Sequence, residues 1–110
     1  LAALAEGQSP LVFSVQGPDD PAVARLREAV ATAGLTIEAV NDRIGAALGT
    51  ILDRVLRETR LTRAVISGGD TSSHAAGQLG IDALTAIAPV APGAPLCRAH
   101  APESERDGLE

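Results

Sequence analysis

The chain contains no tryptophan, tyrosine or methionine, and Phe13 is its one aromatic residue. A core without rings has to be built from Ala, Val, Ile and Leu, which suits helices packed on a buried parallel sheet. Proteins that bind single-stranded nucleic acids stack bases on aromatic side chains, and this chain lacks such platforms. The scarcity of aromatic residues therefore favours an aliphatic α/β core and disfavours recognition of exposed bases.

Basic residues are also scarce. Lys and Arg number 9 against 14 Asp and Glu, which gives a net charge of −5 and an isoelectric point near 4.9. Proteins that bind nucleic acids draw affinity from clustered cations, so we expect no DNA or RNA partner. No apolar segment approaches the roughly 18 residues of a membrane span, and no secretory signal is visible. We therefore expect a soluble, cytoplasmic protein without a membrane partner.

Cys97 is the single cysteine, so no internal disulfide can form, and no Cys/His cluster surrounds it. We interpret it as an ordinary residue in a loop. A length of 110 residues with 45% hydrophobic residues suits one domain with a real core. Because the chain opens on Leu1 rather than on methionine and stops after an acidic loop, we expect a single α/β domain, residues 1–110, from a longer protein.

Local signals predict helices with clear ends. Asp20 is placed to cap a first turn that begins with Pro21, and Gly34 is placed to end that helix. In the next segment apolar residues recur every three or four positions, and Gly45 and Gly49 predict close packing against a neighbour. A further helix is expected to end at the following glycine, position 80. The three expected helices cover residues 20–34, 36–59 and 71–79.

Short apolar runs bounded by Gly and Pro predict strands at residues 10–15, 62–67 and 81–90. A Pro-rich loop, "APVAPGAPLCRAHAPE", is expected around and after the last of them. The order strand, helix, helix, strand, helix, strand predicts an α/β fold. We expect a mostly parallel sheet flanked by helices, in a three-layer, Rossmann-like but partial domain with right-handed crossovers.

The bend "SGGDTSS" follows the expected strand 62–67, at the sheet edge where such folds bind ligands. Gly68 and Gly69 remove side chains where a ligand has to approach the backbone. The free N–H groups of the next helical turn then point outward, and the hydroxyls of Thr71 and Ser72 add donors. The bend therefore predicts a phosphate site, although the same pattern also occurs as a purely structural turn.

Asp70 is an unexpected neighbour for an anion, and two roles explain it. Its side chain can cap the helix, or it can hold a magnesium ion, directly or through water, that the phosphates share. Neither a Walker A loop nor a GxGxxG motif is present, because no GKS or GKT follows and Gly68 and Gly69 are adjacent.

Other residues have weaker signals. His74 lies one turn into the expected helix, where it can reach a phosphate or simply face solvent. The adjacent carboxylates Asp19 and Asp20 are better explained by helix capping than by chemistry. Pro92–Pro95 is either a rigid loop beside the pocket or a plain turn. Ser14, at the end of the first expected strand, is a possible pocket wall.

Three segments carry a resemblance to a known family: "RIGAALGTILDRVLRETRLTRA", "RAVISGGDTSSHAAGQLGI" and "PVAPGAPLCRA". Over roughly residues 10–99 the chain resembles the C-terminal nucleotide-binding domain of the four-carbon acid sugar kinase family. The resemblance implies an ATP-dependent kinase that phosphorylates a small sugar acid of the tetronate or 3-oxo-tetronate type. It also implies an amino-terminal domain that carries the sugar site and the catalytic base.

Carried over to this chain, the resemblance places the nucleotide pocket on Gly68, Gly69, Asp70 and Thr71, with Ser72 as a weaker addition. It implies ATP as the nucleotide and no catalytic residue within the chain. Mg²⁺ at Asp70 is the second of the two roles given above for that carboxylate. Because the sugar domain, an earlier Gly-Ser strand and a final Lys- and Gly-rich motif are absent from the 110 residues, we expect this fragment alone to be inactive.

Two alternatives remain open from the sequence. A glycerate-type kinase can show a similar glycine pair followed by an acidic residue and threonines. A non-catalytic α/β binding module would use the same bend only as structure. Apolar surface left bare by missing parts would also allow a homodimer.

Overall fold

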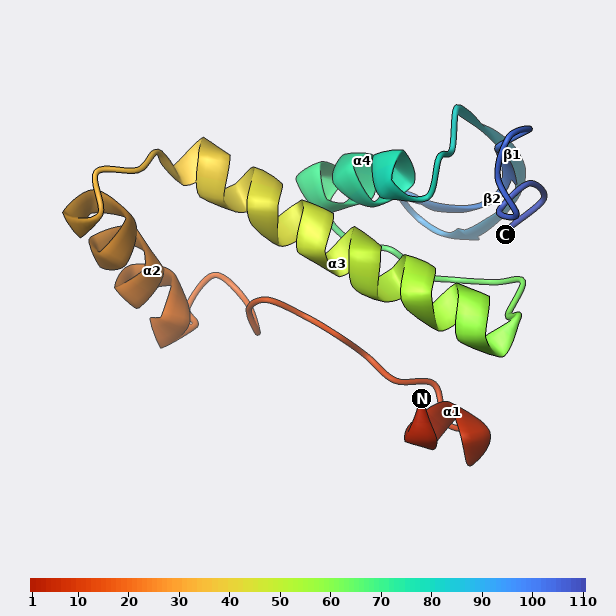
Figure 1. Ribbon diagram of the computed structural model, residues 1–110, viewed down its shortest axis with the longest axis horizontal. Coiled ribbons are helices and arrows are strands. Elements are labelled where there is room, and N and C mark those ends of the chain that lie inside the picture. Colours follow the sequence, from red (N-terminus) through yellow and green to blue (C-terminus); the bar gives the residue numbers. More distant parts are fainter.

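The computed structural model describes residues 1–110, in which four helices precede one β-hairpin (Figure 1). The longest helix, α3, crosses the molecule, and α4 lies alongside it (Figure 1). The elements are α1 (Ala2–Ala5), α2 (Pro21–Thr32), α3 (Ile37–Thr59), α4 (Gly69–Gln78), β1 (Ala83–Ala91) and β2 (Ala94–His100). The chain is therefore a small mixed α/β unit.

No helix combines the length and hydrophobicity needed to cross a membrane.

The expected helix ends are confirmed by their capping bonds. Asp20 accepts a hydrogen bond from the backbone N–H of Ala22 at 2.8 Å, and Pro21 opens α2. Thr36 caps α3 in the same way, accepting from the backbone N–H of Ala39 at 3.2 Å. These local bonds explain why the helices could be predicted from the sequence.

Gly45 and Gly49 are buried in α3 and let α4 approach closely, as the sequence predicts. A Cβ placed on Gly45 would lie 2.8 Å from the Cβ of His74. A Cβ on Gly49 would lie 2.9 Å from the Cβ of Gln78 and 3.0 Å from the Cα of Ala75. Because both contacts follow the same order along the two helices, α3 and α4 run parallel.

The sheet is a two-stranded antiparallel hairpin, in which Ala83 pairs with His100 and Ala91 with Ala94. Gly93, with a φ of 76°, forms the turn between the strands. The core lies where the hairpin and the C-terminal segment meet the ends of α3 and α4. It consists of Leu56, Leu79, Ala99 and Leu109, with Leu52, Ile66 and Ile81 packed against them.

The expected parallel sheet is wrong, because two of its three strands find no ladder partner. Residues 10–15 make no backbone hydrogen bond, and Leu11 is 81% exposed. Residues 62–67 are extended, with Ile66 turned to the core and Val65 93% exposed, so they are not buried on both faces. Neither the three-layer arrangement nor the right-handed crossovers form without these strands.

Parallel pairing does begin at one point. The backbone N–H of Ala64 donates to the carbonyl oxygen of Glu110 at 2.8 Å, and the N–H of Glu110 donates to the carbonyl of Thr62 at 2.9 Å. Arg63, between them, also forms an ion pair with the Glu110 carboxylate, which lowers the pKa of that carboxyl group. The segment predicted as a strand therefore has the hydrogen-bonding pattern of a parallel pair at one residue.

The hairpin confirms the last expected strand as β1 and corrects the Pro-rich loop, most of which forms β2. Pro89 and Pro95 face each other across the hairpin, and the register shifts on both sides of Pro89. Each strand of a two-stranded sheet has one free edge, where the missing N–H of proline is tolerated. For this reason the prolines did not prevent a strand from forming.

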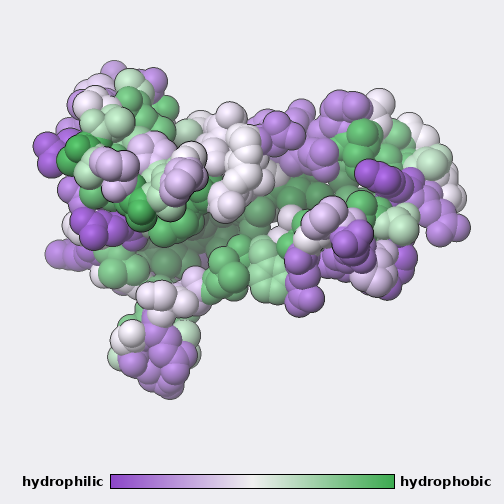
Figure 2. Space-filling model, turned by 180° about the vertical axis from the view of Figure 1, so that it is seen from behind, coloured by the Kyte–Doolittle hydropathy of each residue, from purple (hydrophilic) through white to green (hydrophobic).

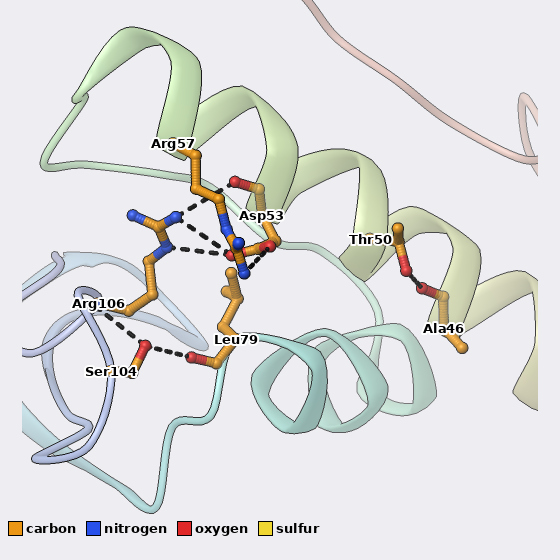
Figure 3. A network of polar contacts seen from close by, with 7 residues as sticks. All are labelled: Ala46, Thr50, Asp53, Arg57, Leu79, Ser104 and Arg106. Atoms are coloured by element: carbon orange, nitrogen blue, oxygen red, sulfur yellow. Dashed lines mark hydrogen bonds and ion pairs between the residues drawn. The ribbon is translucent and has the colours of Figure 1, made fainter.

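A polar network ties the C-terminal segment to α3 and to the end of α4 (Figure 3). Arg106 is 8% exposed and donates to Asp53 through Nε and Nη2, each 3.2 Å from Oδ1. Arg57 pairs with the other carboxylate oxygen of Asp53 at 2.8 Å. The hydroxyl of Ser104 donates to the carbonyl of Leu79 at 3.0 Å. The network fixes the segment that closes the core.

Large apolar side chains remain on the surface. Leu84, Ile87 and Val90 of β1 are all exposed. Figure 2 shows apolar residues across the middle of one face. The molecule therefore has less buried core than its composition allows.

The α3–α4 contact predicts opposite effects for two glycine substitutions. Gly49→Ala should lower the free energy of unfolding by about 1–2 kcal/mol, because overpacking against the Ala75 backbone outweighs the gain in helix propensity. Gly77→Ala should raise it by about 0.5–1 kcal/mol, because nothing lies within 4 Å of the added Cβ. Urea denaturation of both variants checks this, and equal effects would contradict the close helix contact.

The Arg106 network predicts a loss of stability when one partner is removed. Arg106→Ala should cost about 2–3 kcal/mol, because the half-buried Asp53 keeps only Arg57 as a partner. Arg54→Ala is the matched control: this arginine and its partner Glu58 lie on the surface, so the loss of stability should be far smaller than for Arg106→Ala. Denaturation midpoints of the two variants decide the matter, and similar midpoints would show that the network is not stabilising.

Candidate functional site

The bend before α4 has the backbone conformation that its glycines predict. Gly68 is the N-cap of α4, with φ 102° and ψ 131°, which side chains rarely tolerate. Gly69 begins the helix, and no heavy atom outside its immediate neighbours lies within 4 Å of a Cβ built there. Gly68 is therefore required by the backbone, whereas Gly69 leaves open space above the helix start.

The first amides of α4 are free. No protein acceptor receives the backbone N–H of Gly69, Asp70 or Thr71, and the first amide with a partner is that of Ser72, which donates to the carbonyl of Gly68 at 2.8 Å. No side chain caps the helix either. Three adjacent N–H groups at the positive end of a helix dipole can bind an anion.

The hydroxyls near the helix start differ in their availability. Ser72 donates to the carbonyl of Gly68 at 2.6 Å, and Ser73 donates to the carbonyl of Gly69 at 3.3 Å. Their protons are therefore used within the helix. Thr71 lines a neighbouring cavity and makes no side-chain hydrogen bond within the protein. Of these hydroxyls, Thr71 is the best placed to donate to a ligand.

Asp70 does not cap α4, contrary to the first role considered for it. Its carboxylate lies in the first turn of the helix, where the dipole favours negative charge, and it lines the same cavity as Thr71. No group of three or more His, Cys, Asp or Glu side chains is arranged to hold a metal ion. A cation beside Asp70 would therefore need ligands from water or from a bound molecule.

The cavity has a volume of about 490 Å³, which lies within the range of small-molecule sites. It is bounded by the segment before α2, by α2 itself, by the first half of α3 and by the start of α4. Its apolar walls are Val15, Ala22, Val23, Leu26, Ile37 and Ile44. Its polar wall includes Ser14, where the sequence places a possible pocket wall, together with Asp70 and Thr71.

His74 has neither of the two roles considered for it, which were contact with a phosphate and exposure to solvent. Its Nε2 lies 3.1 Å from Oδ1 of Asp42, and its ring packs over Gly45. The side chain is 34% exposed and does not line the cavity. His74 therefore joins α4 to α3 and does not stand free in solvent.

Two further residues or segments singled out in the sequence lie in the hairpin. Pro92–Pro95 contains the turn of the hairpin and does not line the cavity, so it is a turn and not a loop beside the pocket. Cys97 lies half-buried in β2 rather than in a loop.

Two polar residues of the cavity were missed by sequence reasoning. Arg27 on α2 and Asn41 on α3 both face it. Arg27 directly follows Leu26 and lies four residues after Val23, so its position beside the apolar face of α2 was a usable signal. The spacing of apolar residues predicts the buried face of each helix. It does not predict which helix faces come together around a cavity.

The comparison with protein families decides the assignment. The family described as "Nucleotide-binding C-terminal domain" matches residues 1–110. The chain belongs to this family. Its resemblance to the C-terminal nucleotide-binding domain of four-carbon acid sugar kinases is thereby confirmed.

A curated relative of this nucleotide-binding domain is the 3-oxo-isoapionate kinase of Paraburkholderia graminis. The two sequences are 45% identical over 108 residues, which cover 98% of this chain and 23% of the relative. The chain thus spans about a quarter of the relative's length. No solved structure matches the chain.

The cap that orients α2 predicts a pH dependence at one wall of the cavity. The backbone N–H groups of Gln16 and Ala22 donate to Asp20 and lower the pKa of its carboxyl group. A lowered pKa in the folded state means that the cap stabilises the fold above the usual aspartate range and loses this effect as the pH falls through the folded value.

Backbone amide chemical shifts of Gln16 and Ala22, followed by NMR during acidification, should both report this titration. Asp20→Asn should remove it, whereas Asp19→Asn should leave it unchanged because Asp19 makes no such bond. A titration of these two amides that survives in Asp20→Asn would refute the assignment.

Proposed function

We propose that this chain is the nucleotide-binding part of an ATP-dependent kinase that phosphorylates small sugar acids, of the tetronate or 3-oxo-tetronate type. The observation that carries the proposal is the set of free amides at Gly69, Asp70 and Thr71. They open beside a 490 Å³ cavity in a chain of the nucleotide-binding C-terminal domain family.

The start of α4 binds the phosphates of ATP in this proposal. Gly69 has no side chain, so phosphate oxygens can approach the three amides directly. Thr71 adds its hydroxyl. Ser72 would add least, because its backbone N–H and its hydroxyl both donate to the carbonyl of Gly68. The site is thus built mainly from backbone groups.

Asp70 suits a magnesium ion shared with the phosphates. Mg²⁺ in phosphate sites is commonly held by one or two carboxylates plus phosphate oxygens and water, so a single carboxylate fits this chemistry. When bound, the ion would neutralise charge on the phosphates. Asp70 would hold it directly or through water and would thereby orient the phosphate chain.

The apolar walls suit the base and the ribose. Val23 and Leu26 of α2 and Ile37 and Ile44 of α3 are half-buried and line the cavity. No aromatic residue lines this cavity, so aliphatic side chains have to cover the faces of a bound base. The cavity thereby combines a polar end with apolar walls, as nucleotide sites do.

The sugar acid and the catalytic base would come from other parts of the whole protein. Phosphoryl transfer needs the acceptor hydroxyl in line with the γ-phosphate, and the cavity of this chain offers no histidine or second carboxylate to act on it. The relative is named for 3-oxo-isoapionate, which supports a 3-oxo sugar acid and disfavours a glycerate-type kinase. The 110 residues alone would bind nucleotide without transferring phosphate.

Isothermal titration with ATP tests this site. The chain should bind MgATP, and Gly69→Val should weaken binding roughly ten-fold or more, because the side chain blocks charge-assisted hydrogen bonds to the amides. Gly77→Val is the matched control: it lies on the same helix, also has open space and is distant from the start. Its affinity should match that of the unaltered chain.

Asp70→Asn tests the magnesium role in the same assay. The unaltered chain should bind ATP more tightly in the presence of Mg²⁺ than in the presence of EDTA. Asp70→Asn should remove most of this difference in affinity. Unchanged affinity in both Gly69→Val and Asp70→Asn would refute the site.

A further inference from the structure

Arg27 is the one positively charged residue that lines the cavity. Its guanidinium group makes no ion pair or hydrogen bond within the protein. Arg25, Arg43 and Arg60 are also unpaired, but none of them lines the cavity. Because Arg27 is exposed and unpaired at the edge of the cavity, it is free to bind a negatively charged occupant.

The position of Arg27 follows from the way α2 is built. Asp20 caps the helix, which sets the rotation of its first turns, and Val23 and Leu26 face the cavity from successive turns. Arg27, four residues after Val23, shares that face. Arg27 therefore lines the cavity from α2, whereas Asp70 and Thr71 line it from the start of α4.

The charges that line the cavity indicate what Arg27 can contribute. Asp70 is the other charged residue of the cavity, so the lining carries no net charge. A triphosphate brings several negative charges, and the three amides supply only partial positive charge. Without Arg27, the carboxylate of Asp70 would oppose the ligand with no full positive charge from the protein.

We propose that Arg27 binds the phosphate chain of the nucleotide from the side opposite the start of α4, and so makes the site selective for nucleotides over nucleosides. This inference rests on the proposed function. A guanidinium group can donate two parallel hydrogen bonds to one phosphate and keeps its charge at any physiological pH. Arg27 and the α4 amides then hold the phosphates between two helices.

The test compares ATP with adenosine by isothermal titration on the full chain. Arg27→Gln should weaken ATP binding roughly ten-fold or more, in line with loss of a charge-assisted hydrogen bond, and should leave adenosine binding unchanged. Arg43→Gln is the matched control, because it removes the same charge from an exposed residue outside the cavity. Arg27→Lys should recover part of the loss, since it restores the charge but not the planar pair of donors.

The outcomes separate this inference from the proposed function. ATP affinity that is the same in Arg27→Gln and Arg43→Gln would overturn the role of Arg27 while leaving the nucleotide site intact. Equal weakening of ATP and adenosine by Arg27→Gln would also overturn it, because the side chain would then support the cavity wall and not the phosphates. If the unaltered chain binds neither ligand, the proposed function itself fails. Circular dichroism of each variant should show unchanged helix content, because Arg27 is exposed.

Discussion

The close contact between α3 and α4 is the constraint on which the arrangement depends. Gly45 and Gly49 are buried in α3 and have no side chains, so α4 can pack directly against the α3 backbone. A Cβ atom at Gly45 would clash with His74, and one at Gly49 would clash with Gln78. Helices held at this separation have little freedom to slide or rotate, because their surfaces interlock. The contact therefore fixes where α4 lies, and with it the place of Asp70 and Thr71 beside the cavity.

Helices α2, α3 and α4 were predictable because their signals are local, whereas α1, a single turn at Ala2–Ala5, was not expected. Asp20, Thr36 and the glycines act within one or two turns, and the structure places the helix ends within two residues of the expected positions. The sheet was not predictable, because strand pairing depends on partners distant in sequence. Residues 10–15 have strand composition but no partner, whereas β2 formed despite Pro95 because β1 lay beside it.

The candidate site divides in the same way. Residues from Gly68 to Ser72 are contiguous, so a strand-like segment, two glycines and a helix start were enough to mark them. Arg27 and Asn41 come from two other helices, and only the tertiary arrangement of α2, α3 and α4 brings them to one cavity. The family resemblance implied the nucleotide and the kinase class, but the segments that carry it begin at Arg43 and so include neither Arg27 nor Asn41.

The cavity wall that contains Ser14 and Val15 belongs to a stretch, residues 9–15, with no main-chain hydrogen bonds. Its position is maintained on one side by the bonds of Asp20 to Gln16 and Ala22. An occupant that contacts this stretch would order it, and that ordering costs conformational entropy. The heat capacity change on association should then be more negative than a rigid cavity of the same surface would give, because additional apolar area leaves water.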